Sequence, residues 1–124
     1  MRFSNILASA LLVWGCQADE SIVTNDALDA ITSGALVVDV RTPEEFNEGH
    51  FPGAINIPHE QVIQGLRDRN IQPDRTVILY CRSGNRSGTA AAMLLTEGYS
   101  RVRNVGGLEA FLAATDTNRV IPLP

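Results

Sequence analysis

The chain has 124 residues, enough for one domain with a hydrophobic core and too few for two. Its 44% apolar and 19% charged residues are typical of a globular protein, and its net charge of −4 disfavours a nucleic acid as the partner. All ten basic residues are arginine, which excludes lysine Schiff-base chemistry and a P-loop lysine.

The first residues have the pattern of a secretory signal. A positive start at Arg2 precedes an apolar stretch at residues 6–14, far shorter than the ~20 residues that span a bilayer. Residues 12–16, with the sequence LVWGC, resemble the lipobox of bacterial lipoproteins. An uncleaved anchor and a chance apolar start are the alternatives.

The lipobox resemblance implies a division of the chain and a location. Residues 1–15 would be a signal peptide, residues 16–23 a lipidated Cys16 with its tether, and residues 24–124 the folded domain. The domain would then lie in the periplasm or cell envelope of a bacterium, and a lipid anchor alone would hold it to the membrane.

Only two cysteines occur, Cys16 and Cys81. If Cys16 is lipidated, Cys81 has no partner for an intrachain disulfide, even in an oxidising compartment. An unpaired thiol there is an oxidation liability, so its presence favours a chemical use. The structural alternative is a Cys16–Cys81 disulfide, which would block the thiol.

Short apolar runs alternate with helical patterns along the remaining chain. Capping residues at 24–26 precede a short helix that ends at Gly34, and proline at position 43 begins a second helix. The predicted strands are 35–40, 54–57, 76–80 and 101–105, and the predicted later helices are 59–69, 89–97 and 108–113. This alternation predicts an α/β fold whose parallel sheet is covered by helices on both faces.

Polar residues follow two of the predicted strands. Asp39 and Arg41 end the first, and Thr42 can cap the next helix with Glu45 at the capping-box position. Cys81 ends the third strand. Because ligands bind at the carboxyl ends of parallel strands, we expect these residues to lie near one site.

The central stretch of the chain is Cys81-Arg-Ser-Gly-Asn-Arg-Ser-Gly88, between an apolar strand and an Ala-rich helix. A thiol at this turn faces converging backbone N–H groups and the positive end of the helix dipole, which lower its pKa. Arg82 and Arg86 add planar donors for an oxyanion. The stretch predicts a nucleophile in an anion-binding loop; a buried structural cysteine is the alternative.

Four motifs in order resemble the single-domain rhodanese family of thiosulfate sulfurtransferases. They are DVRTPEEF at 39–46, GHFPGAINIP at 49–58, CRSGNRS at 81–87 and NVGGL at 104–108. The resemblance implies a central five-stranded parallel sheet. The sequence has no Cys/His cluster of the metal-binding type, and we expect neither a metal nor a cofactor. The resemblance also implies that Cys81 forms a persulfide, taking sulfur from thiosulfate or another persulfide and passing it to cyanide or a thiol.

The resemblance also assigns residues to substrate binding. The substrate-binding loop comprises Arg82, Ser83, Gly84, Asn85, Arg86 and Ser87. Arg82 is the expected reader of the thiosulfate oxyanion, but Ser83 stands where many thiosulfate-specific relatives carry a second basic residue. Arg86 would bind substrate or pair with a carboxylate, with Glu45 as the candidate.

The remaining polar residues receive supporting roles. Asp39 and Arg41 would brace the loop from the neighbouring strand end, with packing or capping as an equal alternative. His50 is expected to orient backbone, and His59 to be an ordinary first-turn helix residue.

Two other functions compete with sulfur transfer. Cysteine phosphatases and arsenate reductases use a Cys-x₅-Arg loop, whereas Cys81 to Arg86 is Cys-x₄-Arg, a smaller cradle better suited to one sulfur atom. A non-catalytic binding or sensing module usually lacks the cysteine or has a degraded loop. The expected partners are a small sulfur donor and a sulfur acceptor. The protein is expected to be a monomer.

Overall fold

The computed structural model describes residues 26–115, which form a parallel four-stranded sheet in the order β2-β1-β3-β4. The strands are β1 (Leu36–Asp39), β2 (Ile55–Asn56), β3 (Val77–Cys81) and β4 (Val102–Gly107). The helices are α2 (Pro43–Glu48), the short 3₁₀ helix η1 (His59–Gln61), α3 (Val62–Asp68), α4 (Asn85–Thr96) and α5 (Leu108–Ala114), and residues 26–32 are also helical.

The prediction of five strands is wrong for the described part of the chain, which has four. The fifth strand came only from the family resemblance. Within residues 26–115, each of the four predicted apolar runs forms one strand, and no further run of that kind is present to form another. Residues 1–25, which include Cys16 and its tether, lie outside the described part of the chain.

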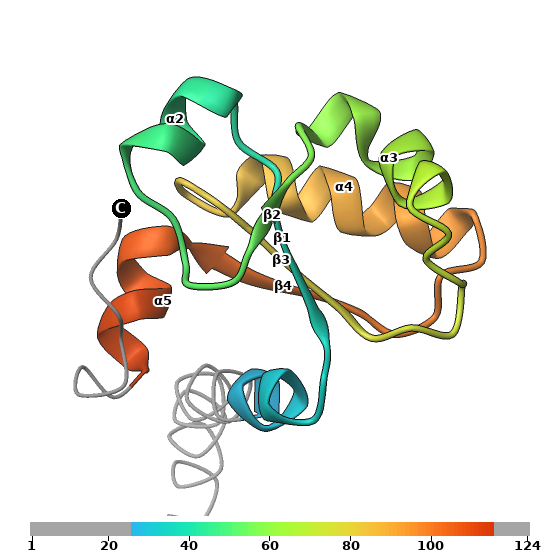
Figure 1. Ribbon diagram of the computed structural model, residues 1–124, viewed down its shortest axis with the longest axis horizontal. Coiled ribbons are helices and arrows are strands. Elements are labelled where there is room, and N and C mark those ends of the chain that lie inside the picture. The colour runs from blue at the N-terminus through green and yellow to red at the C-terminus, as the bar shows by residue number, and fades with distance from the viewer. Residues whose placement is uncertain (1–25, 116–124) are drawn as a thin grey trace, which may run out of the picture.

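Helices cover both faces of the sheet, as the alternating pattern predicted (Figure 1). Successive side chains of a strand point to opposite faces, and β3 is buried on both. Val77, Leu79 and Cys81 pack with α3 and α4, whereas Ile78 and Tyr80 pack with α5 and residues 26–32. This alternation places the Cys81 side chain on the α4 face of the sheet.

Helix α4 begins at Asn85, four residues before the predicted start at residue 89. Gly84 precedes it with a φ of 99°, a left-handed conformation that glycine adopts without steric cost. Gly88 is already helical, and its N–H donates to the Gly84 carbonyl at 2.9 Å. The loop between β3 and α4 is therefore only residues 82–84, shorter than expected.

The predicted cap of α2 is confirmed. The Thr42 side chain accepts a hydrogen bond from the Glu45 N–H at 3.2 Å, and the Glu45 carboxylate accepts one from the Thr42 N–H at 3.0 Å. Pro43 occupies the first turn, where its missing N–H has no cost. The cap fixes the start of α2 at the carboxyl end of β1 and holds the Glu45 side chain there.

Figure 1 shows α2, the loop after β3 and the start of α5 at the same end of the sheet. Because all strands are parallel, their carboxyl ends meet at this edge. Within residues 26–115, no helix has the length and apolar composition needed to cross a membrane.

Candidate active site

The Cys81 thiol lies at the start of α4, surrounded by donors. The Gly84 N–H donates to Sγ at 2.9 Å and the Ser87 N–H at 3.5 Å. The Ser87 hydroxyl is 3.3 Å from the same sulfur. The cysteine is fully buried and its thiol is free. The sulfur therefore faces two backbone N–H donors and a hydroxyl whose single proton is also within reach of Asn104 Oδ1, at the positive end of a helix dipole.

These surroundings favour the thiolate. Burial raises the pKa of the Cys81 thiol, but hydrogen bonds from the Ser87 side chain and from the N–H groups of Ser87, Gly84 and Ser83 outweigh it. The pKa of Cys81 is therefore below its ordinary value. A thiolate is the nucleophilic form of cysteine, so the cradle prepares Cys81 for attack on an electrophile.

A side-chain network fixes the hydroxyl of Ser87. Its Oγ is 2.6 Å from Asn104 Oδ1 and 3.2 Å from the Gly84 carbonyl, in addition to its contact with Cys81. Asn104 in turn donates from Nδ2 to the Gly84 carbonyl at 3.2 Å. No role for Asn104 is predicted from the sequence, although the residue lies in the fourth motif. Its position connects β4 to the cradle.

Both loop arginines bind Glu45. Arg86 makes a two-pronged pair with the carboxylate, at 2.8 and 3.1 Å, and Arg82 donates from Nε at 2.9 Å. These contacts, the Arg86 pair first, hold the pKa of the Glu45 carboxyl far below its ordinary value despite some burial. The predicted pairing of Arg86 with Glu45 is confirmed, and the pairing of Arg82 with the same carboxylate is an addition to it.

Asp39 and Arg41 form a buried pair beside this site. Arg41 binds the Asp39 carboxylate through Nε at 2.9 Å and NH2 at 2.6 Å, and it also donates to the Gly49 carbonyl. The Tyr80 hydroxyl donates to Asp39 at 2.7 Å and accepts from the Phe51 N–H. The network thus reaches the loop through Tyr80, the residue before Cys81, and among the described residues neither Asp39 nor Arg41 makes a hydrogen bond to residues 82–87.

Two glycines of the fourth motif let the chain pass closely beneath the loop. A Cβ on Gly107 would lie 2.2 Å from the Arg82 carbonyl oxygen, inside any permitted contact. A Cβ on Gly84 would lie 3.2 Å from the Gly106 Cα. The β3–β4 register shifts between Leu79 and Cys81, which brings Gly107 opposite Cys81. The glycine pair was visible in the sequence, but its partner segment was not.

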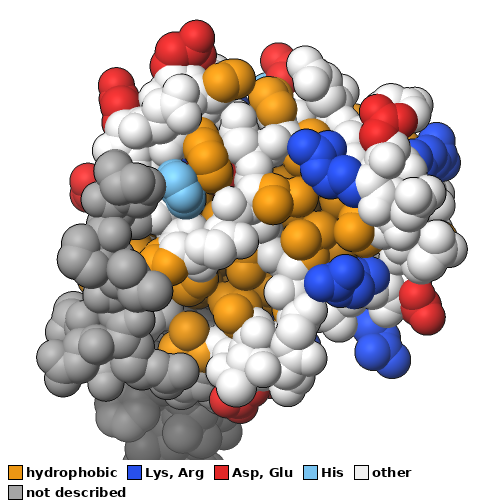
Figure 2. Space-filling view, viewed as in Figure 1, with side chains coloured by type: hydrophobic (Ala, Val, Ile, Leu, Met, Phe, Trp, Pro, Cys, Tyr) orange, Lys and Arg blue, Asp and Glu red, His pale blue; other side chains and the backbone are white. Residues whose placement is uncertain are grey.

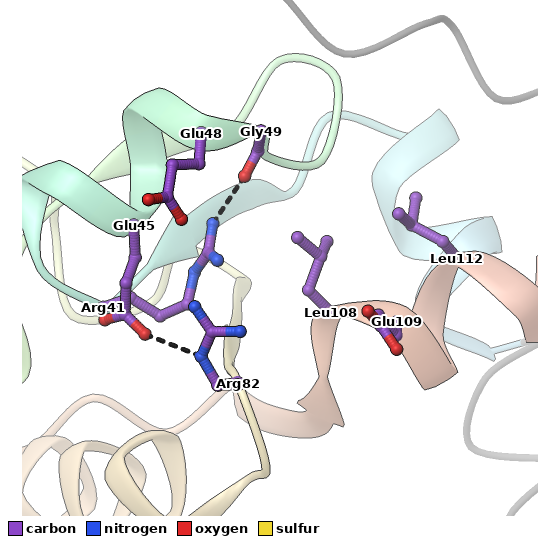
Figure 3. Close-up of a pocket in the computed structure, with 8 residues that line it drawn as sticks. All are labelled: Arg41, Glu45, Glu48, Gly49, Arg82, Leu108, Glu109 and Leu112. Atoms are coloured by element: carbon purple, nitrogen blue, oxygen red, sulfur yellow. Dashed lines mark hydrogen bonds and ion pairs between the residues drawn. The ribbon is translucent and has the colours of Figure 1, made fainter.

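A cavity of about 600 Å³ opens beside the arginines. Its lining consists of Arg41, Glu45, Glu48, Gly49, Arg82, Leu108, Glu109 and Leu112. Figure 3 shows the α5 side chains on one side of this cavity and those of α2 and Arg41 on the other. Cys81 itself does not line the cavity; its neighbour Arg82 does.

The histidines are outside the cradle. His50 stacks on Phe46 with ring centroids 3.7 Å apart and contacts the Phe46 carbonyl through Nδ1, a position that orients the turn after α2. His59 begins η1 and faces Glu60. Within residues 26–115, no group of three His, Cys, Asp or Glu side chains is placed to hold a metal ion.

The fold and the site together define an α/β protein with a free, buried cysteine thiol at the carboxyl end of a central parallel strand. The family model described as "Rhodanese-like domain" matches residues 23–114. The chain belongs to the rhodanese-like domain family.

Named relatives agree with this assignment. The chain is 44% identical over 78 residues to a protein named "Sulfurtransferase" from Allochromatium vinosum, a match covering 63% of this chain and 71% of the relative. It is 40% identical over 72 residues to the thiosulfate sulfurtransferase PspE of Escherichia coli, covering 58% and 69%. The solved structure "rhodanese with anions from E. coli" matches with 38% identity and a TM-score of 0.59, covering 61% of this chain and 89% of that one.

Proposed function

We propose that the protein is a sulfurtransferase that carries sulfur as a persulfide on Cys81. The observation that carries the proposal is the donor cradle: the Gly84 N–H at 2.9 Å, with the Ser87 N–H and hydroxyl, surrounds one sulfur atom. A ping-pong transfer needs a nucleophilic thiolate and a place to hold the negative persulfide, and the same donors serve both states. Relatives named sulfurtransferases support the reaction class.

The two half-reactions balance without a cofactor. The Cys81 thiolate attacks the sulfane sulfur of thiosulfate, a sulfur–sulfur bond forms on Sγ, and the original sulfur–sulfur bond breaks to release sulfite. Cyanide or a thiolate then attacks the outer sulfur and leaves Cys81 as a thiolate again. A donor other than thiosulfate follows the same steps with its own leaving group.

The loop residues have two kinds of role: some contact Cys81, and the two arginines bind the substrate or hold the loop in place. Gly84 and Ser87 supply hydrogen bonds to Cys81, and the Ser83 N–H helps to lower the pKa of the thiol, whereas Asn85 begins the helix whose dipole points at it. Arg82 binds the anionic part of the donor. Its side chain is 62% exposed and held by a single hydrogen bond, so it is free to turn toward a donor. Arg86 is held by two hydrogen bonds to Glu45 and maintains the shape of the loop.

The test is mass spectrometry of the protein after treatment with thiosulfate. We expect Cys81 to gain the mass of one sulfur atom, which cyanide then removes as thiocyanate, and we expect no gain in Cys81→Ser. Arg82→Ala should raise the KM for thiosulfate, whereas Arg75→Ala, an exposed arginine that binds the Gly34 carbonyl, is the matched control.

Two results would overturn the proposal. A protein that stays unmodified with every small sulfane donor, yet binds a ligand at the loop, would be a binding or sensing module. Cys81-dependent hydrolysis of an aryl phosphate, without thiocyanate formation, would indicate a phosphatase. The two-pronged Glu45–Arg86 pair argues against the phosphatase, because that guanidinium is already occupied by a carboxylate.

We also propose that the protein is a monomer held in the cell envelope by a lipid on Cys16. The support is the LVWGC pattern at residues 12–16, which lies outside the described residues. Metabolic labelling with a fatty acid, in cells expressing wild type or Cys16→Ala, tests the anchor. Label on wild type alone supports it, and equal absence of label from both would overturn it. The molar mass of the Cys16→Ala chain in solution tests the oligomeric state.

A further inference from the structure

The cavity beside Arg82 has one apolar wall. Leu108 and Leu112 lie one turn apart on α5, and Figure 3 shows both leucine side chains on the side of the cavity opposite α2. A small inorganic anion such as thiosulfate has no apolar part to place against them. A cavity of about 600 Å³ with such a wall fits an organic molecule with a short aliphatic body.

The charged residues of the cavity carry an excess of negative charge. Two guanidinium groups line it. Arg41 is paired with Asp39, whereas Arg82 shares the Glu45 carboxylate with Arg86, so these last three side chains together keep one positive charge. Glu48 and Glu109 also line the cavity, and neither forms an ion pair with another residue in the described part of the chain.

Glu48 does not stabilise the helix that carries it. It is the last residue of α2, where the negative end of the helix dipole disfavours a carboxylate. Figure 2 shows acidic side chains gathered over α2, and α2 carries Glu44 and Glu45 as well. A dianion approaching the cavity therefore meets uncompensated negative charge, whereas a cation is attracted.

We propose that this cavity binds the body of the sulfur donor, with its persulfide end directed past Arg82 toward Cys81, and that the donor is a small aliphatic persulfide bearing an ammonium group. The aliphatic body packs on Leu108 and Leu112, and the ammonium group lies between Glu48 and Glu109. The inference rests on the sulfur transfer proposed above and names its substrate class.

The transfer step balances for such a donor. The Cys81 thiolate attacks the terminal sulfur of the persulfide R–S–SH, a new sulfur–sulfur bond forms on Sγ, and the sulfur–sulfur bond of the persulfide breaks. The electron pair leaves with the thiolate R–S⁻, and the proton stays on the transferred sulfur. Arg82 is held by a single hydrogen bond to Glu45, so its guanidinium can turn toward the thiolate R–S⁻ as that charge forms.

The experiment compares three short aliphatic persulfides with head groups of different charge, and thiosulfate as the inorganic donor. Aminoethyl, hydroxyethyl and carboxyethyl persulfide, together with thiosulfate, are reacted with the full chain carrying Cys16→Ala in a mild detergent, and kcat/KM is measured for sulfur loading of Cys81. We expect the ammonium donor to exceed the carboxylate donor by about tenfold at low salt, and the ratio to fall as salt screens the charges.

Two variants test whether the preference for a positively charged donor arises in the cavity. Glu48→Gln and Glu109→Gln should each lower the ratio of ammonium to carboxylate donor by about two- to fivefold, as expected for one exposed charge. Glu44→Gln is the matched control, because it removes the same charge from α2 at a residue that does not line the cavity. Since Glu109 also lies in the first turn of α5, melting temperatures are measured for every variant.

The outcomes separate the two proposals. Loading by no donor would overturn sulfur transfer itself. Loading by all donors with equal or reversed charge preference, or a preference that Glu48→Gln and Glu109→Gln leave unchanged, would overturn the substrate class and leave sulfur transfer standing. A preference that only these two variants weaken supports the cavity as the donor site.

Discussion

The Arg86 guanidinium binds the Glu45 carboxylate through two hydrogen bonds, at 2.8 and 3.1 Å, although the two residues are 41 positions apart in the sequence. The pair ties the start of α4 to the start of α2. Glu45 performs a second task in the same place, since its carboxylate also accepts from the Thr42 N–H. One side chain thus caps a helix and holds the loop beside Cys81.

Glu45→Gln should destabilise the fold in a pH-dependent way. The folded protein holds the pKa of Glu45 below its ordinary value of 4.5, so the pair contributes stability above that value and loses it as pH falls. We expect the variant to lose roughly 1 kcal/mol of unfolding free energy at neutral pH. Denaturant unfolding at several pH values should show the difference from wild type shrinking below pH 4.5, and a constant difference would contradict the pairing.

Ser87→Ala should raise the pKa of the Cys81 thiol. The hydroxyl is the largest favourable contact that offsets burial, so its loss leaves the thiolate less stabilised. The pH dependence of thiolate absorbance in the Cys16→Ala chain, where Cys81 is the only thiol, measures the shift. Ser83→Ala is the control, because Ser83 contributes through its backbone N–H, and its titration should match wild type. An unchanged titration in Ser87→Ala would remove the hydroxyl from the cradle.

Gly107→Ala should disturb the loop, because its Cβ would meet the Arg82 carbonyl oxygen at 2.2 Å and neither backbone can yield cheaply. We expect a loss of about 1–3 kcal/mol in unfolding free energy. Gly88→Ala is the contrast. Gly88 lies inside α4, and a Cβ there would be 3.4 Å from the Asn104 amide nitrogen, an ordinary contact. That change should stabilise the protein by roughly 0.5–1 kcal/mol. Equal effects in chemical denaturation would argue against the close approach of the two segments.

The buried Asp39 network should respond unequally to two substitutions. Asp39→Ala leaves the buried Arg41 guanidinium without its carboxylate, which costs about 3–5 kcal/mol. Tyr80→Phe removes one hydroxyl that serves Asp39 and the Phe51 N–H, which costs about 1–3 kcal/mol. Urea unfolding of both variants gives the comparison. A Tyr80→Phe loss larger than that of Asp39→Ala would show that the hydroxyl, and not the ion pair, dominates.

Local patterns predicted the elements that depend on neighbouring residues. The capping box of α2 joins residues three apart, and the apolar run before Cys81 forms a strand because every side chain in it is buried. The start of α4 was predicted four residues late, because the loop sequence gave no sign that Gly84 would turn left-handed and cap the helix there.

The sequence by itself determined the thiol, its donors and the α/β class, since the strand, the short turn and the following helix are contiguous and bring the N–H groups to Cys81. Only the tertiary structure decided that Arg82 meets Glu45, that Ser87 meets Asn104, and that α5 and α2 enclose a cavity with unpaired carboxylates. The two residue pairs lie 37 and 17 positions apart, and the two helices lie farther apart still. Their meeting depends on strand order and register, which contacts between distant segments settle and local sequence does not encode.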